Sequence, residues 1–147
     1  MKRVLLIILF IFPFSLFADE KRVTEEMLLG DWECDIKVRK AKWENGSFDE
    51  YGKIESDKGK IKNFMKDDVL YFNFGNPTSY PFQLESYYNN SEQLQNNDYQ
   101  KVKQSKSIEY LTFDKYKIIV EAEVLFNEDF NNNIKTHTEL VCERIKE

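Results

Sequence analysis

Histidine, cysteine, proline and glycine are all scarce in this chain, which has one, two, three and five of them in 147 residues. Nucleophilic catalysis of the Ser–His or Cys–His kind needs a base beside the nucleophile, and His137 has no nucleophile motif around it. The glycines are scattered singly, so no Gly-rich loop can hold a phosphate. We therefore expect a protein that is not an enzyme and has no catalytic residues and no cofactor.

Metal-ligand patterns are missing as well. His137 has the opposite parity to Cys142 and is expected to face solvent beside Glu139. The oxygen-rich stretch Asp129–Asn133 lacks the glycine and the glutamate that complete a calcium-binding loop. We expect no bound metal.

Excess positive charge is also absent. Lys and Arg number 21 against 26 Asp and Glu, which gives a formal net charge of −5. Nucleic acids and anionic lipids recruit proteins through Lys and Arg, so neither is expected as a partner. An acidic surface is compatible with a basic protein partner, although solubility alone also accounts for it.

A long apolar run is confined to the first residues. A basic start precedes an apolar stretch over Val4–Phe17, and Ala18 stands before an acidic pair. This order is typical of a secretory signal peptide, and the stretch is shorter than the roughly 20 residues of a membrane-spanning helix. We expect residues 1–18 to be a signal peptide and residues 19–147 to form one domain, periplasmic or secreted, without stable membrane insertion.

The two cysteines, Cys34 and Cys142, lie far apart in sequence, unlike the Cys-x-x-Cys pairs of thiol–disulfide enzymes. In an exported protein they are expected to form a structural disulfide. If the bond joins directly opposite positions of two antiparallel strands, the same register sets Trp32 against Arg144. We therefore predict that the first and last strands pair, and that Trp32 and Arg144 close one end of the sheet.

Alternation of apolar and charged residues predicts β-strands through most of the chain. From Asp31 to Arg39, even-numbered residues are apolar and odd-numbered residues are charged. A helical turn over Thr24–Leu29, with Thr24 as its N-cap, is expected before this strand. Further strands are expected over 48–55, 60–66, 69–74, 80–88, 107–113, 116–126 and 134–145, with turns at residues such as Asn45-Gly46, Lys58-Gly59 and Asp67-Asp68.

Two polar segments interrupt the strand pattern. Residues 89–98 and 127–133 are rich in Asn, and we expect loops there, with a short helix through Val102 as an alternative for the first. The eight or nine strands predict an antiparallel barrel or a sandwich. Pairing of the first strand with the last favours a closed barrel, because closure brings the ends of a sheet together.

Gly30-Asp31-Trp32 at the start of the first strand and Arg144 in the last resemble the lipocalins and the wider calycin superfamily. In that family a Gly-x-Trp motif begins the barrel and an arginine near its end packs over the tryptophan. The resemblance covers the two ends of the chain, and no further lipocalin motif is present. The chain is also similar to small exported bacterial proteins with a Gly-x-Trp-x-Cys start and a Cys-x-Arg end. The resemblance implies an all-β, antiparallel, eight- to nine-stranded lipocalin-like barrel with a short N-terminal helical turn.

Aromatic residues are plentiful and alternate within the expected strands. They either fill the barrel interior or line a cavity for one apolar ligand. The expected cavity lining comprises Phe72, Phe74, Phe82, Leu84, Val120 and Val124. Our first hypothesis is a monomeric, exported binding protein that holds a small hydrophobic molecule in the barrel interior. The second is a protein-binding inhibitor or immunity-type module that uses an acidic, aromatic surface against a basic protein partner.

Overall fold

The computed structural model describes residues 21–89 and 93–146, so the expected signal peptide at 1–18 lies outside the described residues. In chain order the elements are α1 (Glu25–Leu28), β1 (Gly30–Glu44), β2 (Ser47–Phe48), β3 (Glu55–Lys66), β4 (Val69–Asn73), β5 (Tyr80–Pro81), α2 (Glu85–Tyr88), β6 (Gln93–Asn96), β7 (Gln100–Thr112), β8 (Lys115–Phe126), the 3₁₀ turn η1 (Phe130–Asn132) and β9 (Ile134–Arg144). Within the described ranges, no helix is long and apolar enough to cross a bilayer.

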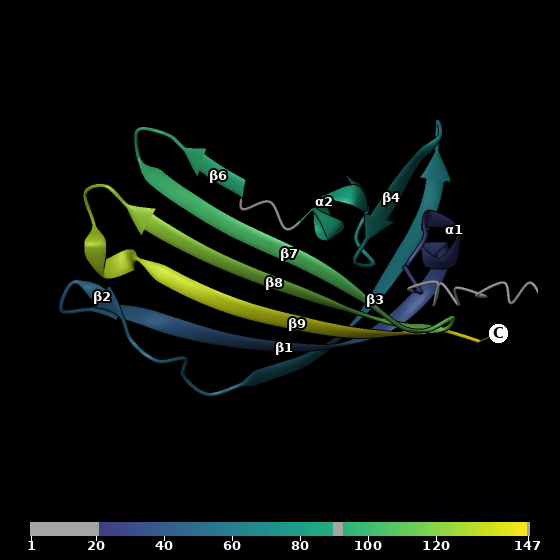
Figure 1. Ribbon diagram of the computed structural model, residues 1–147, viewed down its shortest axis with the longest axis horizontal. Helices are drawn as coiled ribbons and strands as arrows, with labels where there is room; N and C mark the ends of the chain where they lie inside the picture. Colours follow the sequence, from purple (N-terminus) through teal and green to yellow (C-terminus); the bar gives the residue numbers. More distant parts are fainter. Residues whose placement is uncertain (1–20, 90–92, 147) are drawn as a thin grey trace, which may run out of the picture.

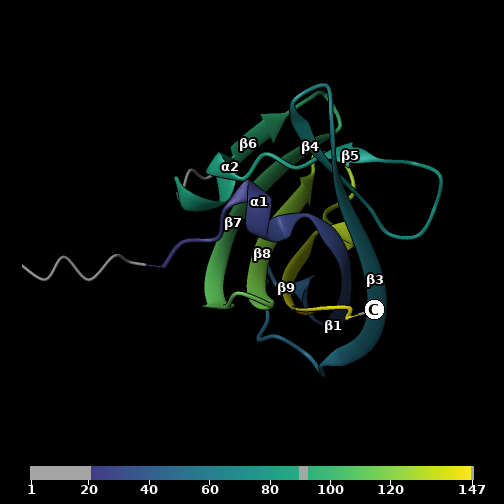
Figure 2. The same cartoon turned by 90° about the vertical axis from the view of Figure 1, so that its right-hand side faces the viewer.

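The strands form one antiparallel sheet in the order β5-β4-β3-β1-β9-β8-β7-β6, and the short β2 pairs with β1. Figure 1 shows the long central strands running side by side, and the end-on view in Figure 2 shows them curling around α1. The predicted all-β, antiparallel, barrel-like fold with an N-terminal helical turn is therefore confirmed. Over the described residues no pairing joins β5 to β6, so the sheet is a curled half-barrel. The closed barrel expected from the pairing of the first and last strands is therefore wrong for this part of the chain, because β1 and β9 pair in the middle of the sheet.

The hydrophobic core lies at one end of this half-barrel, on its concave face. Thr24 is the N-cap of the short α1, as expected, and its side chain accepts a hydrogen bond from the Met27 amide. Met27 and Leu28 of this turn are buried against the sheet. The core cluster consists of Val23, Met27, Leu28, Trp32, Cys34, Ile61, Leu70, Phe82, Leu84, Ile108, Tyr116, Ile118 and Cys142.

The expected turn at Lys58-Gly59 is wrong, because β3 runs through it from Glu55. Gly59 pairs with Cys34 of β1, and a Cβ added to Gly59 would lie 3.1 Å from the Cδ1 atom of Ile36. A side chain at this position would crowd Ile36, and the glycine lies within a strand rather than at a turn. The expected strand over 48–55 is also wrong, because β2 ends at Phe48 and β3 begins only at Glu55.

The strand expected over 80–88 is mostly helical turn. Only Tyr80–Pro81 pairs with β4, and the chain then enters α2, where the Ser86 hydroxyl and amide both donate to the Gln83 carbonyl. Proline lacks an N–H for further pairing, which limits β5 to the sheet edge.

The loop expected over 89–98 is wrong for Gln93–Asn96, which is a strand. The alternative, a short helix through Val102, is also wrong, because a strand begins at Gln100. Gln93–Asn96 forms β6, which pairs with the first half of β7. The first half of β7 also pairs with β8. Their side chains are polar, and the inter-strand hydrogen bonds order the backbone without much apolar burial. The hydrophobic pattern that reveals other strands is therefore faint here.

Candidate functional site

The structure brings Cys34 and Cys142 together as a disulfide, with their Cα atoms 4.0 Å apart. The register of β1 and β9 sets Cys34 opposite Cys142 and Trp32 opposite Arg144. The Cζ atom of Arg144 lies 4.3 Å from the centroid of the Trp32 ring, which is fully buried. These four residues therefore form two successive pairs at the end of the sheet where the core lies.

Arg144 also ties this end of the sheet to α1. Its Nη1 donates to the Leu29 carbonyl at 2.6 Å, and its Nη2 donates to the Met27 carbonyl at 2.5 Å. Its Nε donates to Asp114 at 3.1 Å in the turn between β7 and β8. The guanidinium thus satisfies carbonyls that a helix end leaves without partners. The three hydrogen bonds of Arg144 within the described residues thus join β9 to α1 and to the β7–β8 turn.

One buried polar residue of this end, Asn63 of β3, was not singled out by sequence reasoning. Its Nδ2 donates to the Leu28 carbonyl at 2.8 Å, and the Trp32 Nε1 donates to the same oxygen at 2.7 Å. Its alternation with Ile61 is the signal that could have placed it on the core face. Burial raises the pKa of Tyr116, which packs edge-on to Trp32, and the Asn63 amide partly opposes this rise.

The six residues expected to line a cavity do not lie together. Phe82 and Leu84 are buried in the core, and Phe72 and Val120 pack against it. Phe82 stacks on Tyr87 of α2 with ring centroids 4.9 Å apart, and Phe72 meets Phe82 edge-on. Phe74 is 49% exposed beyond the end of β4. Val124 lies outside the core cluster, in the other half of the sheet.

Side chains on the concave face align in rows across β1, β9, β8 and β7. Rows at the end near α1 make up the filled end: Trp32 and Arg144; Cys34, Cys142, Tyr116 and Tyr110; Ile36, Leu140, Ile118 and Ile108. The next three rows make up what we call the open floor: Val38, Thr138, Val120 and Lys106; Lys40, Thr136, Ala122 and Gln104; Lys42, Ile134, Val124 and Val102. Every open-floor residue is half-buried or exposed.

Charge divides the two faces of these four strands. Every acidic residue of β1, β7, β8 and β9 lies on the outer face except Glu44 at the end of β1. Several of them form cross-strand ion pairs there, such as Glu143 with Lys115 and Glu123 with Lys135. The hydrogen bond from Lys135 to Glu123 raises the pKa of this lysine. The open floor carries lysines and uncharged residues only.

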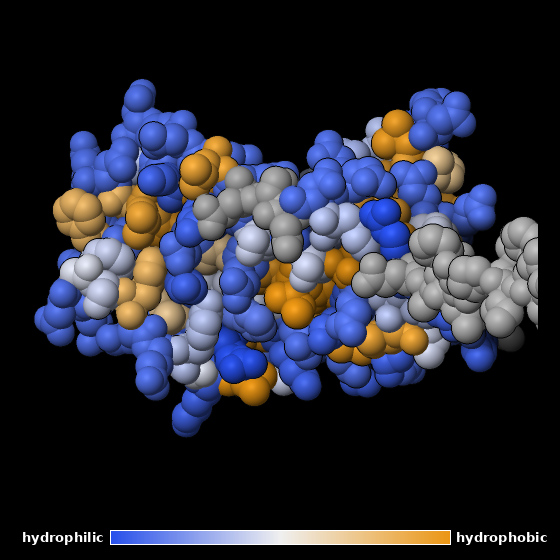
Figure 3. Space-filling view, in the orientation of Figure 1, coloured by the Kyte–Doolittle hydropathy of each residue, from blue (hydrophilic) through white to orange (hydrophobic). Residues whose placement is uncertain are grey.

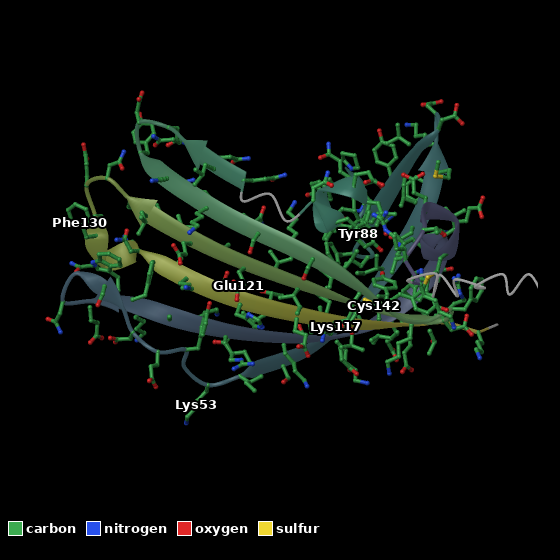
Figure 4. The ribbon with its side chains drawn as sticks, in the orientation of Figure 1. Lys53, Tyr88, Lys117, Glu121, Phe130 and Cys142 are labelled. Carbon is green, nitrogen blue, oxygen red and sulfur yellow. A yellow bond between two sulfur atoms is a disulfide. The ribbon has the colours of Figure 1, made fainter. Side chains whose placement is uncertain are left out.

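Two loops at the open end form a surface that we call the acidic tip, made of Asp98, Tyr99, Glu128, Asp129 and Phe130. The Asn127 amide donates to the Tyr99 carbonyl at 3.0 Å, and the Asn127 side chain donates to the Asp98 carbonyl at 2.9 Å. Tyr99 is 80% exposed and Phe130 60% exposed. Figure 4 shows Phe130 at the end of the molecule opposite to Cys142 and Tyr88.

His137 lies on the outer face, as its sequence parity predicts, but it is half-buried, and its hydrogen-bond partner there is Glu121 of β8. Its Nδ1 lies 3.0 Å from Glu121, and the Tyr51 ring covers it with centroids 5.9 Å apart. Burial raises the pKa of Tyr51, although Lys135 opposes this rise. No group of three or more His, Cys, Asp or Glu side chains that could hold a metal occurs in residues 21–89 and 93–146.

Tyr87 and Tyr88 of α2 are half-buried and pack against the core. Burial raises the pKa of Tyr87. The Tyr88 hydroxyl accepts from the Val23 amide at 2.8 Å and donates to the Val23 carbonyl at 3.2 Å, which fixes the segment before α1.

A comparison with protein-family models and with curated proteins finds no match to this chain, so function has to be inferred from its own surfaces.

Proposed function

We propose that this is an exported, non-enzymatic binding protein that engages a basic protein partner through the acidic tip. One observation carries the proposal: two highly exposed aromatic side chains, Tyr99 and Phe130, lie on loops that also present three carboxylates. Aromatic residues are enriched among those that dominate binding energy, and arginine or lysine side chains stack on their faces.

The carboxylates of the acidic tip are available to a partner. Asp98, Glu128 and Asp129 are exposed and form no ion pair with any described residue. Among the described residues, the Asp129 carboxylate accepts a hydrogen bond only from the Asn132 side chain in its own turn, at 2.7 Å. The hydrogen bonds of Asn127 join the two loops before a partner arrives, which reduces the entropy lost on binding.

Phe113 is another exposed aromatic residue beside an acid, but the neighbouring carboxylate is already paired. Phe113 is 66% exposed and precedes Asp114, at the opposite end of the sheet. Asp114 already pairs with Arg144 at 3.1 Å and Lys146 at 3.4 Å, and the Arg144 guanidinium lies 5.5 Å from the Phe113 ring centroid. Because its charge is already paired, this site attracts a basic partner less strongly than the acidic tip.

The test uses a photoreactive amino acid placed at Tyr99 in the exported protein, in the cells that naturally make it or in contact with their secretions. A discrete adduct with a basic protein is expected, and it should weaken with added salt and with the charge reversals Asp98→Lys and Asp129→Lys. The matched control carries the same photoreactive residue at Phe113. Equal adducts from both positions, or an adduct that ignores both charge reversals, would contradict the proposal.

A further inference from the structure

The open floor is a second surface, distinct from the acidic tip and opposite to it in charge. Its centre on β8 and β9 holds only Val120, Ala122, Val124, Ile134, Thr136 and Thr138, all half-buried. Lysines stand at both sides, Lys40 and Lys42 on β1 and Lys106 on β7. In a chain with a net charge of −5, this face therefore offers apolar contact bordered by positive charge.

The three lysines differ in their exposure and in whether another side chain already contacts their ammonium group. Lys42 is exposed and forms no ion pair with any described residue. Lys106 is half-buried, with its Nζ 5.6 Å from the Tyr87 ring centroid. Lys40 is already paired with Glu55 of β3 at 2.8 Å, and Asp57 lies further along the same strand. A partner's carboxylates therefore gain most from Lys42 and Lys106.

The dimensions of the open floor select the shape of its occupant. Three strand spacings of about 4.8 Å separate β1 from β7, so the two sides lie about 14 Å apart. An α-helix with its side chains is about 10–12 Å across, which matches this width. An extended strand would cover only about a third of it. A small molecule would stay largely exposed, whereas ligand sites bury most of their ligand.

Figure 3 shows that the surface seen in that view is mainly hydrophilic, with apolar residues gathered in separate patches. A limited apolar strip bordered by charge is what one face of an amphipathic helix needs. We propose that the open floor docks an acidic amphipathic helix of a partner protein, with its apolar face on β8 and β9. Glutamates or aspartates on one flank meet Lys42, and those on the other meet Lys106.

The probes are two synthetic helical peptides of about 14 residues with the same apolar stripe. One carries glutamates along both flanks and the other carries lysines there. Fluorescence anisotropy with the disulfide-intact protein should show the acidic peptide binding at least about tenfold more tightly, with affinity that falls as salt is added. Equal affinity for the two peptides would overturn the proposal.

Charge reversals locate the contact. Lys42→Glu and Lys106→Glu should each weaken the acidic peptide about threefold to tenfold, with Lys40→Glu weaker in effect because Glu55 already offsets that charge. The matched controls are Lys37→Glu and Lys101→Glu, which reverse exposed lysines on the outer face of the same two strands. Controls that weaken binding as much as the floor variants would contradict a concave-face site.

A hydrophobic dye tests the competing occupant, the small apolar molecule expected from the sequence. If the dye binds saturably and is displaced by a fatty acid but not by the acidic peptide, the open floor or the core holds a small ligand. The helix proposal then fails. Displacement of the dye by the acidic peptide, lost in Val124→Asp but kept in the outer-face variant Leu125→Asp, supports helix docking. Leu125 is the neighbour of Val124 on β8 and faces the other way.

Discussion

The same four strands build two ends of the molecule whose concave faces have opposite properties. At the filled end, the rows contain Trp32, the disulfide and Tyr116, all buried beneath α1 and α2. At the open floor, two residues further along each strand, the rows change to valine, threonine, glutamine and lysine, and none is buried. The backbone pairing is continuous through both.

This difference separates two sources of order in one sheet. The filled end is stabilised by side-chain burial, which contributes about 25 cal/mol per Å² of apolar surface. The open floor is ordered by the hydrogen bonds between its strands, each of which makes a smaller net contribution, and by the ion pair of Lys135 with Glu123 on the outer face. We therefore expect substitutions at the filled end to change stability and those at the open floor to change binding.

The largest effect is expected from Trp32→Ala. Removing a fully buried indole that packs on Tyr116 and Arg144 should lower the free energy of unfolding by about 3–5 kcal/mol in urea denaturation. Trp43→Ala is the matched control, because Trp43 lies on the same strand at the open end and is only half-buried. A loss at Trp43 as large as that at Trp32 would break the distinction between the two ends.

The double variant Cys34→Ser with Cys142→Ser should lower stability by about 3 kcal/mol, because the bond closes a long loop of the unfolded chain. Urea denaturation measures the loss, and the acidic peptide measures binding to the open floor. Binding at the unchanged affinity, under conditions where the variant is folded, is expected because the bond lies at the filled end. Loss of binding in folded protein would show that the two ends are coupled.

Arg144→Ala should lower stability by about 2 kcal/mol, since it leaves the Met27 and Leu29 carbonyls without their donor. Thermal unfolding should show Arg144→Lys recovering only part of the loss, because an ammonium cannot reproduce the planar fork. Lys115→Ala, which removes the exposed pair with Glu143 in the same region, should cost less than about 0.5 kcal/mol. An unchanged melting temperature for Arg144→Ala would argue against its stacking on Trp32.

Stability should fall above about pH 10 because of Tyr116. Burial raises its pKa in the folded protein, so in alkaline solution the unfolded chain loses this proton first and is favoured. The stabilisation is complete below the ordinary tyrosine pKa and declines by about 1.4 kcal/mol per pH unit above it. Urea denaturation from pH 8 to 11 should show a shallower decline for Tyr116→Phe, with a remainder from Tyr87. Identical slopes for the two proteins would exclude Tyr116 as the cause.

The smallest effect is expected from Val124→Ala at the open floor. Because Val124 is only half-buried, losing two methyl groups should lower stability by less than about 1 kcal/mol. Ile118→Ala, on the same strand and face at the filled end, should cost about 2–4 kcal/mol. Similar losses at both positions would show that the open floor is packed in solution.

The sequence predicts the filled end better than the open end, for a physical reason. A bond between Cys34 and Cys142 specifies one register of the first and last strands, and that register sets Trp32 against Arg144, as the structure has it. Strong apolar alternation marked β1 and β8, where burial selects the residue types. In β6 and the first half of β7, the backbone hydrogen bonds hold the strands together and side-chain burial adds little. The many Gln and Lys residues there show no apolar alternation, so the sequence does not predict these strands.

The surfaces were harder to predict than the strands. That exposed aromatics and carboxylates would share a surface was expected. The loops that carry Tyr99 and Phe130 are joined by the hydrogen bonds of Asn127 and by the adjacent pairing of β7 with β8, across a separation of about 30 residues. The open floor depends on four strands adopting one register, and two of those strands were only partly recognised in the sequence. Asn63 was missed because a polar residue in a strand is usually read as outward-facing, whereas this side chain is buried and donates to the Leu28 carbonyl.

The disulfide joins the first and last strands of the sheet, but these two strands lie at its centre and not at its edges. A mechanical load applied to the two ends of the chain would therefore pass directly across a covalent bond. The residues between Cys34 and Cys142, which are separated by 108 positions, would not bear that load. They include the acidic tip and the open floor. Stretching the chain from its two ends would therefore not unravel the residues that the disulfide bond bridges.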